Sequence, residues 1–397
     1  MKTKIKRRTF LRTTSLGVIG SAVLPYRALA KLTPVEKPSS SLVYRTLGKT
    51  ELKVTVVSYG VMDAENPALL HRALELGINH YDTAHGYQRG RNETMVGEVV
   101  ESMAMRDKVV IATKVALPRD RRTMTYTPQA TKESFLAMLD TSLKRLKTDH
   151  VDILYNHSVY NEKMVNYGEV LEALASAKKS GKARFVGFST HSNEHNVIRS
   201  AIKNGQYEVI LTAHNFLKSN KNELKQAIKE AAQAGIGIVV MKPMALKFDD
   251  YLGERDEKYF ESALKWVLAD KNVACAIPGM TTFDHLNQNF SVMANLEVDK
   301  RDVHQLAKVK FTSAGHYCSI CQECLSTCPK GVDIPEIMRS LMYYNGYHSP
   351  RLALETYSGI PSQQSLEACS DCLRCQAICR NGNNIARAIR SAHKIFT

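Results

Sequence analysis

Between residues 54 and 290 the sequence alternates short runs rich in β-branched residues with longer amphipathic stretches. In the stretch 128–146, Phe135, Leu139 and Leu143 recur at helical spacing, and Thr127-Pro128 supplies a cap and a first-turn proline. The runs expected to form strands are 54–60, 78–83, 109–115, 151–157, 183–189, 208–214, 237–243 and 275–279. Eight strand–helix units in this order predict a (β/α)₈ TIM barrel of the α/β class.

Runs such as 109–115 are continuous rather than alternating, which is typical of parallel strands that are buried on both faces. A doubly wound open sheet is the alternative arrangement of such units. No G-x-G-x-x-G follows the first run, and this absence disfavours the open sheet. The barrel is therefore the preferred fold.

The second part of the chain has a different composition. After about residue 305 the strand-like runs stop, cysteines appear, and helical patterns occupy 334–344 and 384–394. A length of 397 residues suits two domains. We expect the barrel to occupy residues 31–305 and a small α-helical domain to occupy residues 306–397, with the boundary between 299 and 313.

The first 30 residues have the pattern of a removable export signal. They contain basic residues and no acid, followed by an apolar segment at 16–24 and the small-x-small site Ala28-Leu29-Ala30. The apolar segment is shorter than the roughly 20 residues that span a bilayer. The segment 7–12, Arg-Arg-Thr-Phe-Leu-Arg, resembles the twin-arginine motif, and a plain secretory signal is the alternative. We expect cleavage near Lys31, a periplasmic protein without a stable membrane span, and the twin-arginine machinery as a partner.

The net charge of +15 does not by itself indicate a nucleic-acid partner. Part of the excess belongs to the basic N-terminus, and no long basic run occurs in the remainder. We therefore expect no nucleic acid to bind.

Eight of the nine cysteines form two runs with the spacing C-x₂-C-x₂-C-x₃-C. Three thiolates within seven residues can hold one face of a [4Fe-4S] cubane, and the fourth cysteine of such a run reaches the other cluster. On that precedent, one cluster takes Cys318, Cys321, Cys324 and Cys379, and the second takes Cys369, Cys372, Cys375 and Cys328. The ninth, Cys275, lies in the last strand run and is expected to be a core residue.

Disulfides and zinc are the alternatives for these cysteines. Export suggests disulfides, but neighbouring Cys-x-x-Cys pairs would constrain very little chain. Zinc explains paired C-x-x-C knuckles and leaves the third and fourth thiols of each run unexplained.

The tail also resembles a helical two-cluster ferredoxin module. Twin-arginine export suits such a module, because that pathway carries proteins already folded around their clusters.

The barrel region contains a series of short motifs in a fixed order. They are YRTLGKT at 44–50, DTAHGY at 82–87, GRNE at 90–93, VGE at 96–98, ATK at 112–114, SLKRL at 142–146, VDIL at 151–154, GKARFVGFS at 181–189 and IPG at 277–279. Through these motifs the chain resembles the aldo-keto reductase family from about Tyr44 to Asn289. One branch of the family has a C-terminal iron–sulfur extension, which resembles the tail described above.

The resemblance implies a catalytic tetrad, which falls on Asp82, Tyr87, Lys114 and His157. Three of these residues end the second, third and fourth strand runs, where a barrel places its chemistry. Reduction of a carbonyl by hydride needs a proton, and the ordinary pKa of tyrosine, near 10, is high for that task. We expect Lys114 to lower the pKa of Tyr87, Asp82 to keep Lys114 charged, and His157 to hydrogen-bond the carbonyl oxygen.

The resemblance also implies a site for a nicotinamide cofactor. The positions it assigns are Ser189, Thr190, Lys242, Gly279, Thr281, Thr282, His285 and Asn289. Three residues around the expected nicotinamide depart from the family pattern. Thr190 replaces an asparagine, Leu211 replaces a glutamine, and Met241 replaces an aromatic residue. His285 stands where an arginine would bind a 2′-phosphate, so the choice between NAD and NADP stays open.

These patterns predict an exported aldo-keto reductase that acts on an aldehyde, ketone or sugar-like alcohol. Because an exported enzyme has no reduced nicotinamide pool to draw on, we expect the NAD(P)(H) to be tightly bound. An electron-transfer protein with a scaffold barrel and a redox partner protein is the first alternative, and a non-catalytic binding barrel is the second. The tetrad disfavours both alternatives. Thr190 and Leu211, which replace the family's contacts to the nicotinamide amide, favour the electron-transfer protein.

Overall fold

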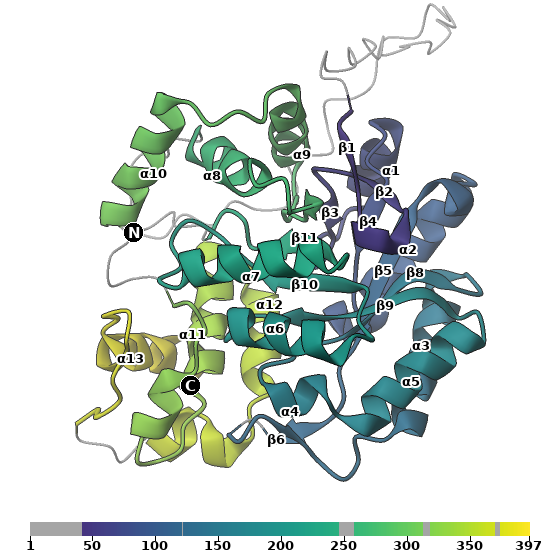
Figure 1. The fold of residues 1–397 in the computed structure, drawn as a ribbon. Coiled ribbons are helices and arrows are strands. Elements are labelled where there is room, and N and C mark those ends of the chain that lie inside the picture. The colour runs from purple at the N-terminus through teal and green to yellow at the C-terminus, as the bar shows by residue number, and fades with distance from the viewer. Residues whose placement is uncertain (1–41, 121, 246–257, 313–317, 370–373) are drawn as a thin grey trace, which may run out of the picture. The chain divides into compact units, whose positions relative to one another are not determined.

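The computed structural model describes residues 42–120, 122–245, 258–312, 318–369 and 374–397 (Figure 1). All of them belong to one compact unit that begins at Pro38. The expected signal peptide, residues 1–30, lies outside the described residues. Within the described ranges, no helix combines the length and the apolar character needed to cross a membrane.

Eight parallel strands form a nearly closed barrel, as predicted. Their order is β3, β4, β5, β8, β9, β10, β11, β12, and parallel bridges from Val57 to Ala276 and from Gly60 to Gly279 join the two ends. The bounds are β3 Tyr59–Gly60, β4 His80–Asp82, β5 Val110–Val115, β8 Val151–Asn156, β9 Ala183–Thr190, β10 Val209–Ala213, β11 Gly237–Met241 and β12 Cys275–Ala276. This is the predicted (β/α)₈ arrangement.

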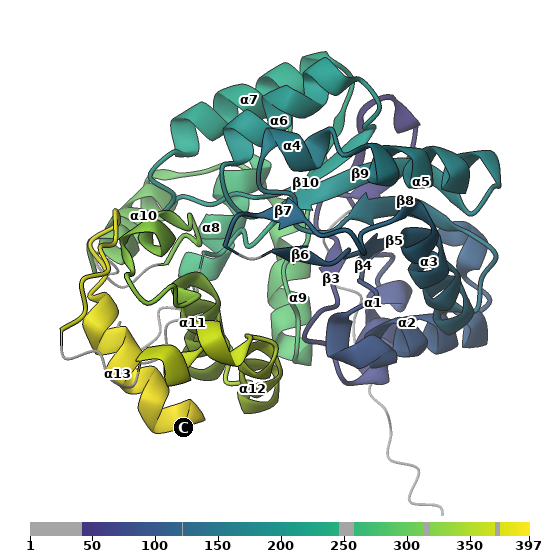
Figure 2. The same ribbon diagram turned by 90° about the horizontal axis from the view of Figure 1, so that it is seen from below.

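Helices surround the barrel on the outside (Figure 2). They are α1 Pro67–Glu75, α2 Arg91–Ser102, α3 Lys132–Leu146, α4 Glu162–Val165, α5 Gly168–Lys179, α6 Glu194–Asn204, α7 Lys221–Gln233, α8 Lys258–Leu268, α9 Phe283–Ser291 and α10 Lys300–Thr312. One cluster of buried residues joins these helices to the outer faces of the strands, through side chains such as Ile111, Leu154 and Ile210.

The inside of the barrel is a second apolar cluster, built from the alternate strand positions. Val110 and Ala112 of β5, Ile153 and Tyr155 of β8, and Leu211 of β10 belong to it. Successive side chains of a strand point to opposite faces, so the next inward positions on β5 and β8 are residues 114 and 157. Cys275 also lies in this interior cluster and is fully buried, as predicted.

Two local predictions were wrong. The run 54–60 is not one barrel strand, because β2 Lys53–Thr55 pairs antiparallel with β1 Tyr44–Thr46 and leaves only Tyr59–Gly60 in the barrel. The helix α3 begins at Lys132 rather than at 128. Thr131 and Ser134 exchange capping hydrogen bonds of 3.1 and 3.2 Å there, which is a stronger start signal than Thr127-Pro128.

The C-terminal segment forms a helical layer with its own apolar core. Its elements are α11 Ile334–Leu341, a π-helical turn Met342–Gly346, α12 Pro350–Ser358 and α13 Ile385–Phe396. Val332, Ile337 and Ile389 are among its buried side chains. The preceding helix α10 crosses the expected boundary at 305, and its Leu306 and Val309 pack with residues of α8. The barrel layer therefore continues to residue 312.

Candidate active site

The structure brings the four tetrad residues together at the carboxyl ends of neighbouring strands. Asp82 is the last residue of β4, Lys114 lies near the end of β5, and His157 directly follows β8. Tyr87 begins the short helical turn Tyr87–Gly90 after β4. Adjacent parallel strands end at the same rim of the barrel, so residues far apart in the sequence meet there.

Lys114 connects the other members of this group. Its Nζ donates hydrogen bonds to Oδ1 of Asp82, to the carbonyl oxygen of Thr83 at 2.6 Å and to Oη of Tyr87 at 3.3 Å. The same Nζ lies 4.7 Å from the centre of the Tyr87 ring. The His157 ring stands edge-on to Tyr87, with ring centres 5.8 Å apart. A buried ammonium with an anionic partner is thus held against the phenol oxygen.

The electrostatics of the site follow mainly from its burial. Burial raises the pKa of Asp82 and lowers the pKa of Lys114, and the contact between the two residues opposes both shifts. The pKa of His157 is lowered well below its ordinary value by burial first, and then by Lys114 and Arg119. His157 is therefore neutral at neutral pH and can donate one ring hydrogen.

The expected lowering of the Tyr87 pKa is wrong for the protein as it stands here. Burial raises the pKa of Tyr87 well above its ordinary value, and Asp82 and Asp63 raise it further. Arg339 is the group that opposes this rise. Tyr87 is therefore a protonated donor over a wide pH range, and the nearby Lys114 can stabilise the phenolate that remains after proton transfer.

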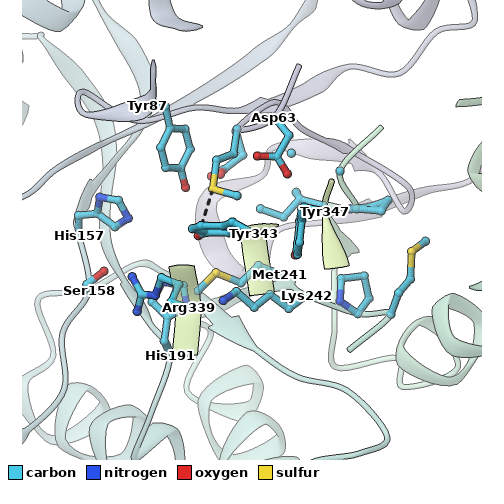
Figure 3. A pocket seen from close by; sticks show the side chains of 18 of the residues that line it. Asp63, Tyr87, His157, Ser158, His191, Met241, Lys242, Arg339, Tyr343 and Tyr347 are labelled. Atoms are coloured by element: carbon cyan, nitrogen blue, oxygen red, sulfur yellow. Dashed lines mark hydrogen bonds between the residues drawn. The ribbon is translucent and has the colours of Figure 1, made fainter. Parts of the chain in front are cut away.

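A cavity of about 300 Å³ is lined by three of the tetrad residues, Asp82, Tyr87 and His157 (Figure 3). Tyr87 and His157 lie on one side of it, and Met241 and Lys242 lie on another. The C-terminal segment supplies the remaining wall with Glu336, Arg339, Tyr343 and Tyr347. Sequence reasoning missed this wall, as it missed Asp63, Arg119 and His191, because no motif marks these residues.

Ion pairs and a tyrosine contact hold the C-terminal segment against the barrel. Glu355 of α12 lies 3.9 Å from both Arg89 and Arg91, and Arg351 pairs with Glu65. The hydroxyl of Tyr343 points at the sulfur of Met62, 4.0 Å away (Figure 3). The cavity is thus formed jointly by the two parts of the chain.

Three of the expected cofactor residues line this cavity: Lys242, Gly279 and Thr281. A side chain added at Gly279 would meet no atom within 4 Å, so a ligand can approach the backbone there. Thr282 caps α9 by accepting a hydrogen bond of 3.1 Å from the backbone of His285. A helix start beside an open glycine suits a phosphate, so these residues fit one end of a dinucleotide.

The other expected cofactor residues do not line the cavity. Oγ of Ser189 accepts a hydrogen bond of 2.9 Å from the backbone of Ser158, and Oγ1 of Thr190 donates one of 3.1 Å to the carbonyl oxygen of Ser192. Asn289 is buried within α9, and Leu211 lies in the barrel interior. Protein groups thus already engage the hydroxyls of Ser189 and Thr190.

The described cysteines gather where the two runs lie side by side. The backbone of Ile378 donates a hydrogen bond of 2.9 Å to Thr327, and Asn381 donates one of 2.7 Å to Ser319. Burial raises the pKa of the Cys324 thiol to about 12, and the nearby thiols of Cys318, Cys321 and Cys379 raise it as well. These are the four residues that were expected to share one cluster.

The second expected set is described in part. Cys328, Cys369 and Cys375 line one small cavity, whereas Cys372 lies outside the described residues. Every cysteine that the structure describes is free of a disulfide. In the same part of the chain, no set of three or more His, Cys, Asp or Glu side chains has a geometry that would hold a metal ion. The thiols are therefore near one another without forming a closed coordination shell.

A parallel barrel with a lysine joined to an aspartate and a tyrosine at its carboxyl rim defines an enzyme of carbonyl–alcohol chemistry. The sequence profile of the Aldo/keto reductase family matches residues 57–261, and the chain belongs to this family. It is an NAD(P)-dependent oxidoreductase of the aldo-keto reductase type.

Curated relatives match about two thirds of the chain. L-glyceraldehyde 3-phosphate reductase of Escherichia coli is 25% identical over 66% of this chain and 91% of its own length. L-galactose dehydrogenase of Arabidopsis thaliana is 24% identical over 67% of this chain and 92% of its own. A solved aldo-keto reductase from Bacillus halodurans, at 24% identity and a TM-score of 0.56, covers 68% of this chain and 96% of its own and shares the fold.

Proposed function

We propose that this protein transfers hydride between a tightly held NAD(P)(H) and an aldehyde, ketone or sugar-like alcohol, and that its tail holds two [4Fe-4S] clusters. The observation that supports the reaction is the contact of Lys114 with both Asp82 and Tyr87 at the floor of the cavity. The printed names of two relatives, a reductase of a phosphorylated aldehyde and a sugar dehydrogenase, favour a sugar-like substrate.

Three side chains of the site have separate roles in a reduction. A bound nicotinamide cofactor supplies the hydride. His157, which is neutral, donates a hydrogen bond to the carbonyl oxygen and orients it beside Tyr87. Tyr87 gives its hydroxyl proton to that oxygen, and Lys114 stabilises the resulting phenolate. In the oxidation direction the same groups act in reverse.

Turnover with a nicotinamide tests the proposal. Holoenzyme purified without air should oxidise its bound NADH or NADPH when glyceraldehyde or 4-nitrobenzaldehyde is added, followed as loss of absorbance at about 340 nm. Denaturing the protein before any nucleotide is added should release bound nicotinamide. A protein that releases none and passes electrons only between artificial donors and acceptors would contradict the proposal and support the electron-transfer alternative.

That alternative has one specific observation in its favour. His191 and Lys242 line the active-site cavity and also a smaller one that contains Cys318. A cluster on Cys318 would therefore lie one side chain away from the active site. Each such cluster normally exchanges one electron, whereas hydride carries two, so we retain hydride transfer between bound cofactor and substrate as the preferred function.

The proposed cluster sets are those expected from the sequence. Cys318, Cys321, Cys324 and Cys379 would hold one cluster, because the first three thiols and Cys379 come from two runs that are hydrogen-bonded side by side. The second set is Cys328, Cys369, Cys372 and Cys375. Apolar residues of the tail core pack against several of these cysteines, which suits a cluster shielded from water.

We also propose export through the twin-arginine pathway. Replacing both Arg7 and Arg8 by lysine should leave the protein in the cytoplasm, because that pathway reads the arginine pair rather than the positive charge. Immunoblots of periplasmic and cytoplasmic fractions measure the distribution. Arg12→Lys, just beyond the pair, is the matched control and should be exported normally. Equal export of the double variant would favour a plain secretory signal.

A further inference from the structure

Two arginines from distant parts of the chain meet at one wall of the active-site cavity. Arg119 lies in the hairpin strand β6 Arg119–Asp120, after β5, and Arg339 lies in α11 of the C-terminal segment. The guanidinium carbon of Arg119 is 5.2 Å from the ring centre of Tyr160, and Arg339 lies near the same tyrosine. Both arginines line the cavity that contains Tyr87 and His157.

Each of these arginines has an unused buried donor. The Nε atoms of Arg119 and Arg339 are inaccessible to solvent and have no hydrogen-bond partner among the described residues. Glu336 pairs with a terminal nitrogen of Arg339 at 3.2 Å, which leaves the Nε of that guanidinium unused. Buried donors are normally satisfied, so the two guanidinium groups have incomplete hydrogen bonding, and the cavity that both of them line is where a further acceptor would lie.

The charges around the wall favour an anion as that acceptor. The two guanidinium groups carry two positive charges and Glu336 balances one of them, so one positive charge is left for a bound anion. Among the acidic residues of the cavity, Asp82 is engaged by Lys114 and Glu336 by Arg339. Figure 3 shows Asp63 near Tyr87, on the far side of the cavity from Arg339. The arginine wall therefore stays electropositive.

The position of Arg119 separates it from the residues expected to bind the cofactor phosphates. Arg119 follows β5, and His157 beside it follows β8, whereas Gly279 and Thr281 follow β12. In the nearly closed barrel β5 and β8 are adjacent, whereas β12 is separated from β5 by β4 and β3 on one side and from β8 by β9, β10 and β11 on the other. Arg119 thus lies on the side of the rim that carries His157, and Arg339 faces the same cavity from α11, beside Lys242 (Figure 3).

We propose that Arg119 and Arg339 bind a carboxylate or phosphate carried by the substrate, while Tyr87 and His157 hold its carbonyl group. Guanidinium groups match both anions through paired N–H donors. The substrate class is then an oxo-acid or a phosphorylated aldehyde or ketone. This assignment rests on the proposed carbonyl reduction, and it makes the C-terminal segment part of the substrate site.

Matched aldehydes test the assignment in the holoenzyme. The pairs are 4-carboxybenzaldehyde against 4-nitrobenzaldehyde, and glyceraldehyde 3-phosphate against glyceraldehyde, which distinguish a carboxylate from a phosphate. We expect kcat/KM to favour the charged member of at least one pair by at least about tenfold. Arg339→Met should remove this preference, mainly through KM of the charged aldehyde, and Arg339→Lys should keep part of it. Arg390→Met, an exposed site on α13, is the matched control and should change nothing.

A binding measurement separates this assignment from the proposed reaction. Calorimetric titration with benzoate and with inorganic phosphate needs no turnover, and at least one should bind to the wild type and lose at least about tenfold in affinity in Arg339→Met. If iron analysis shows that the Arg339→Met variant has lost the clusters of its C-terminal segment, Arg119→Met replaces it as the test variant. An unchanged preference in both variants, or binding of neither anion, overturns the assignment. Arginine-dependent anion binding without any aldehyde reduction would overturn the proposed reaction alone.

Discussion

Tyr87→Phe is expected to lower kcat for carbonyl reduction roughly a thousandfold, because it removes only the hydroxyl that donates the proton. The phenyl ring keeps its edge-on contact with His157, so cofactor affinity should hold. Initial rates with saturating cofactor and titration of bound nucleotide measure the two effects. Because burial raises the pKa of Tyr87, the wild type should not lose its proton donor as the pH rises from 7 to 9.

Tyr155→Phe is the matched control for this variant. Tyr155 is also fully buried inside the barrel, and its hydroxyl has no hydrogen-bond partner within the described structure. It does not line the cavity, so its removal should leave kcat unchanged. Lys114→Met is less informative, because it leaves the carboxylate of Asp82 buried without its cation and destabilises the fold. Wild-type turnover in Tyr87→Phe would mean that the tetrad is not the active site.

The second large effect concerns the pairing of the cysteine runs. Protein purified without air should contain about eight iron and eight sulfide per chain. A double variant within one proposed cluster, Cys318→Ser with Cys379→Ser, should retain about four iron. A double variant within one run, Cys318→Ser with Cys328→Ser, should retain almost none, because it removes one ligand from each cluster. Iron and sulfide analysis, with the visible absorption of the clusters, measures the outcome.

Cys275→Ser provides the control for these variants, since Cys275 is buried in the barrel interior away from both runs. It should retain all of the iron. If each run instead held its own cluster, the two double variants would exchange results. Zinc in place of iron, or disulfides among these cysteines in the native protein, would contradict the cluster proposal itself.

Local patterns in the sequence predicted the barrel, and the resemblance to the aldo-keto reductase family predicted which residues form the tetrad. The continuous apolar character of a strand run indicates that the strand is buried. Lys114 points inward at the rim because it follows Val110 and Ala112 at the alternate positions of β5. The start of α3 was misplaced, since Thr127-Pro128 and Thr131 both resemble caps and only the hydrogen bonds to Ser134 distinguish them.

The arginine wall could not be predicted from the sequence. Arg339 lies on an amphipathic helix, where a charged residue usually faces solvent. Its burial depends on how α11 docks against the barrel, and that docking involves contacts such as Tyr343 with Met62, which are 281 positions apart. The pKa of Tyr87 was misjudged because the sequence does not show how deeply this side chain is buried.

The π-helical turn after α11 provides a way for the shape of such a site to change between related proteins. The backbone of Tyr347 donates to the carbonyl oxygen of Met342, five residues earlier, at 3.1 Å, so the chain here is wound more loosely than in an α-helix. Each residue of an α-helix turns the chain by about 100°, and a deletion of one residue would rotate Tyr347 away from Tyr343 by that amount. The shape of the substrate cavity can therefore change through the length of this turn, with every side chain of the wall retained.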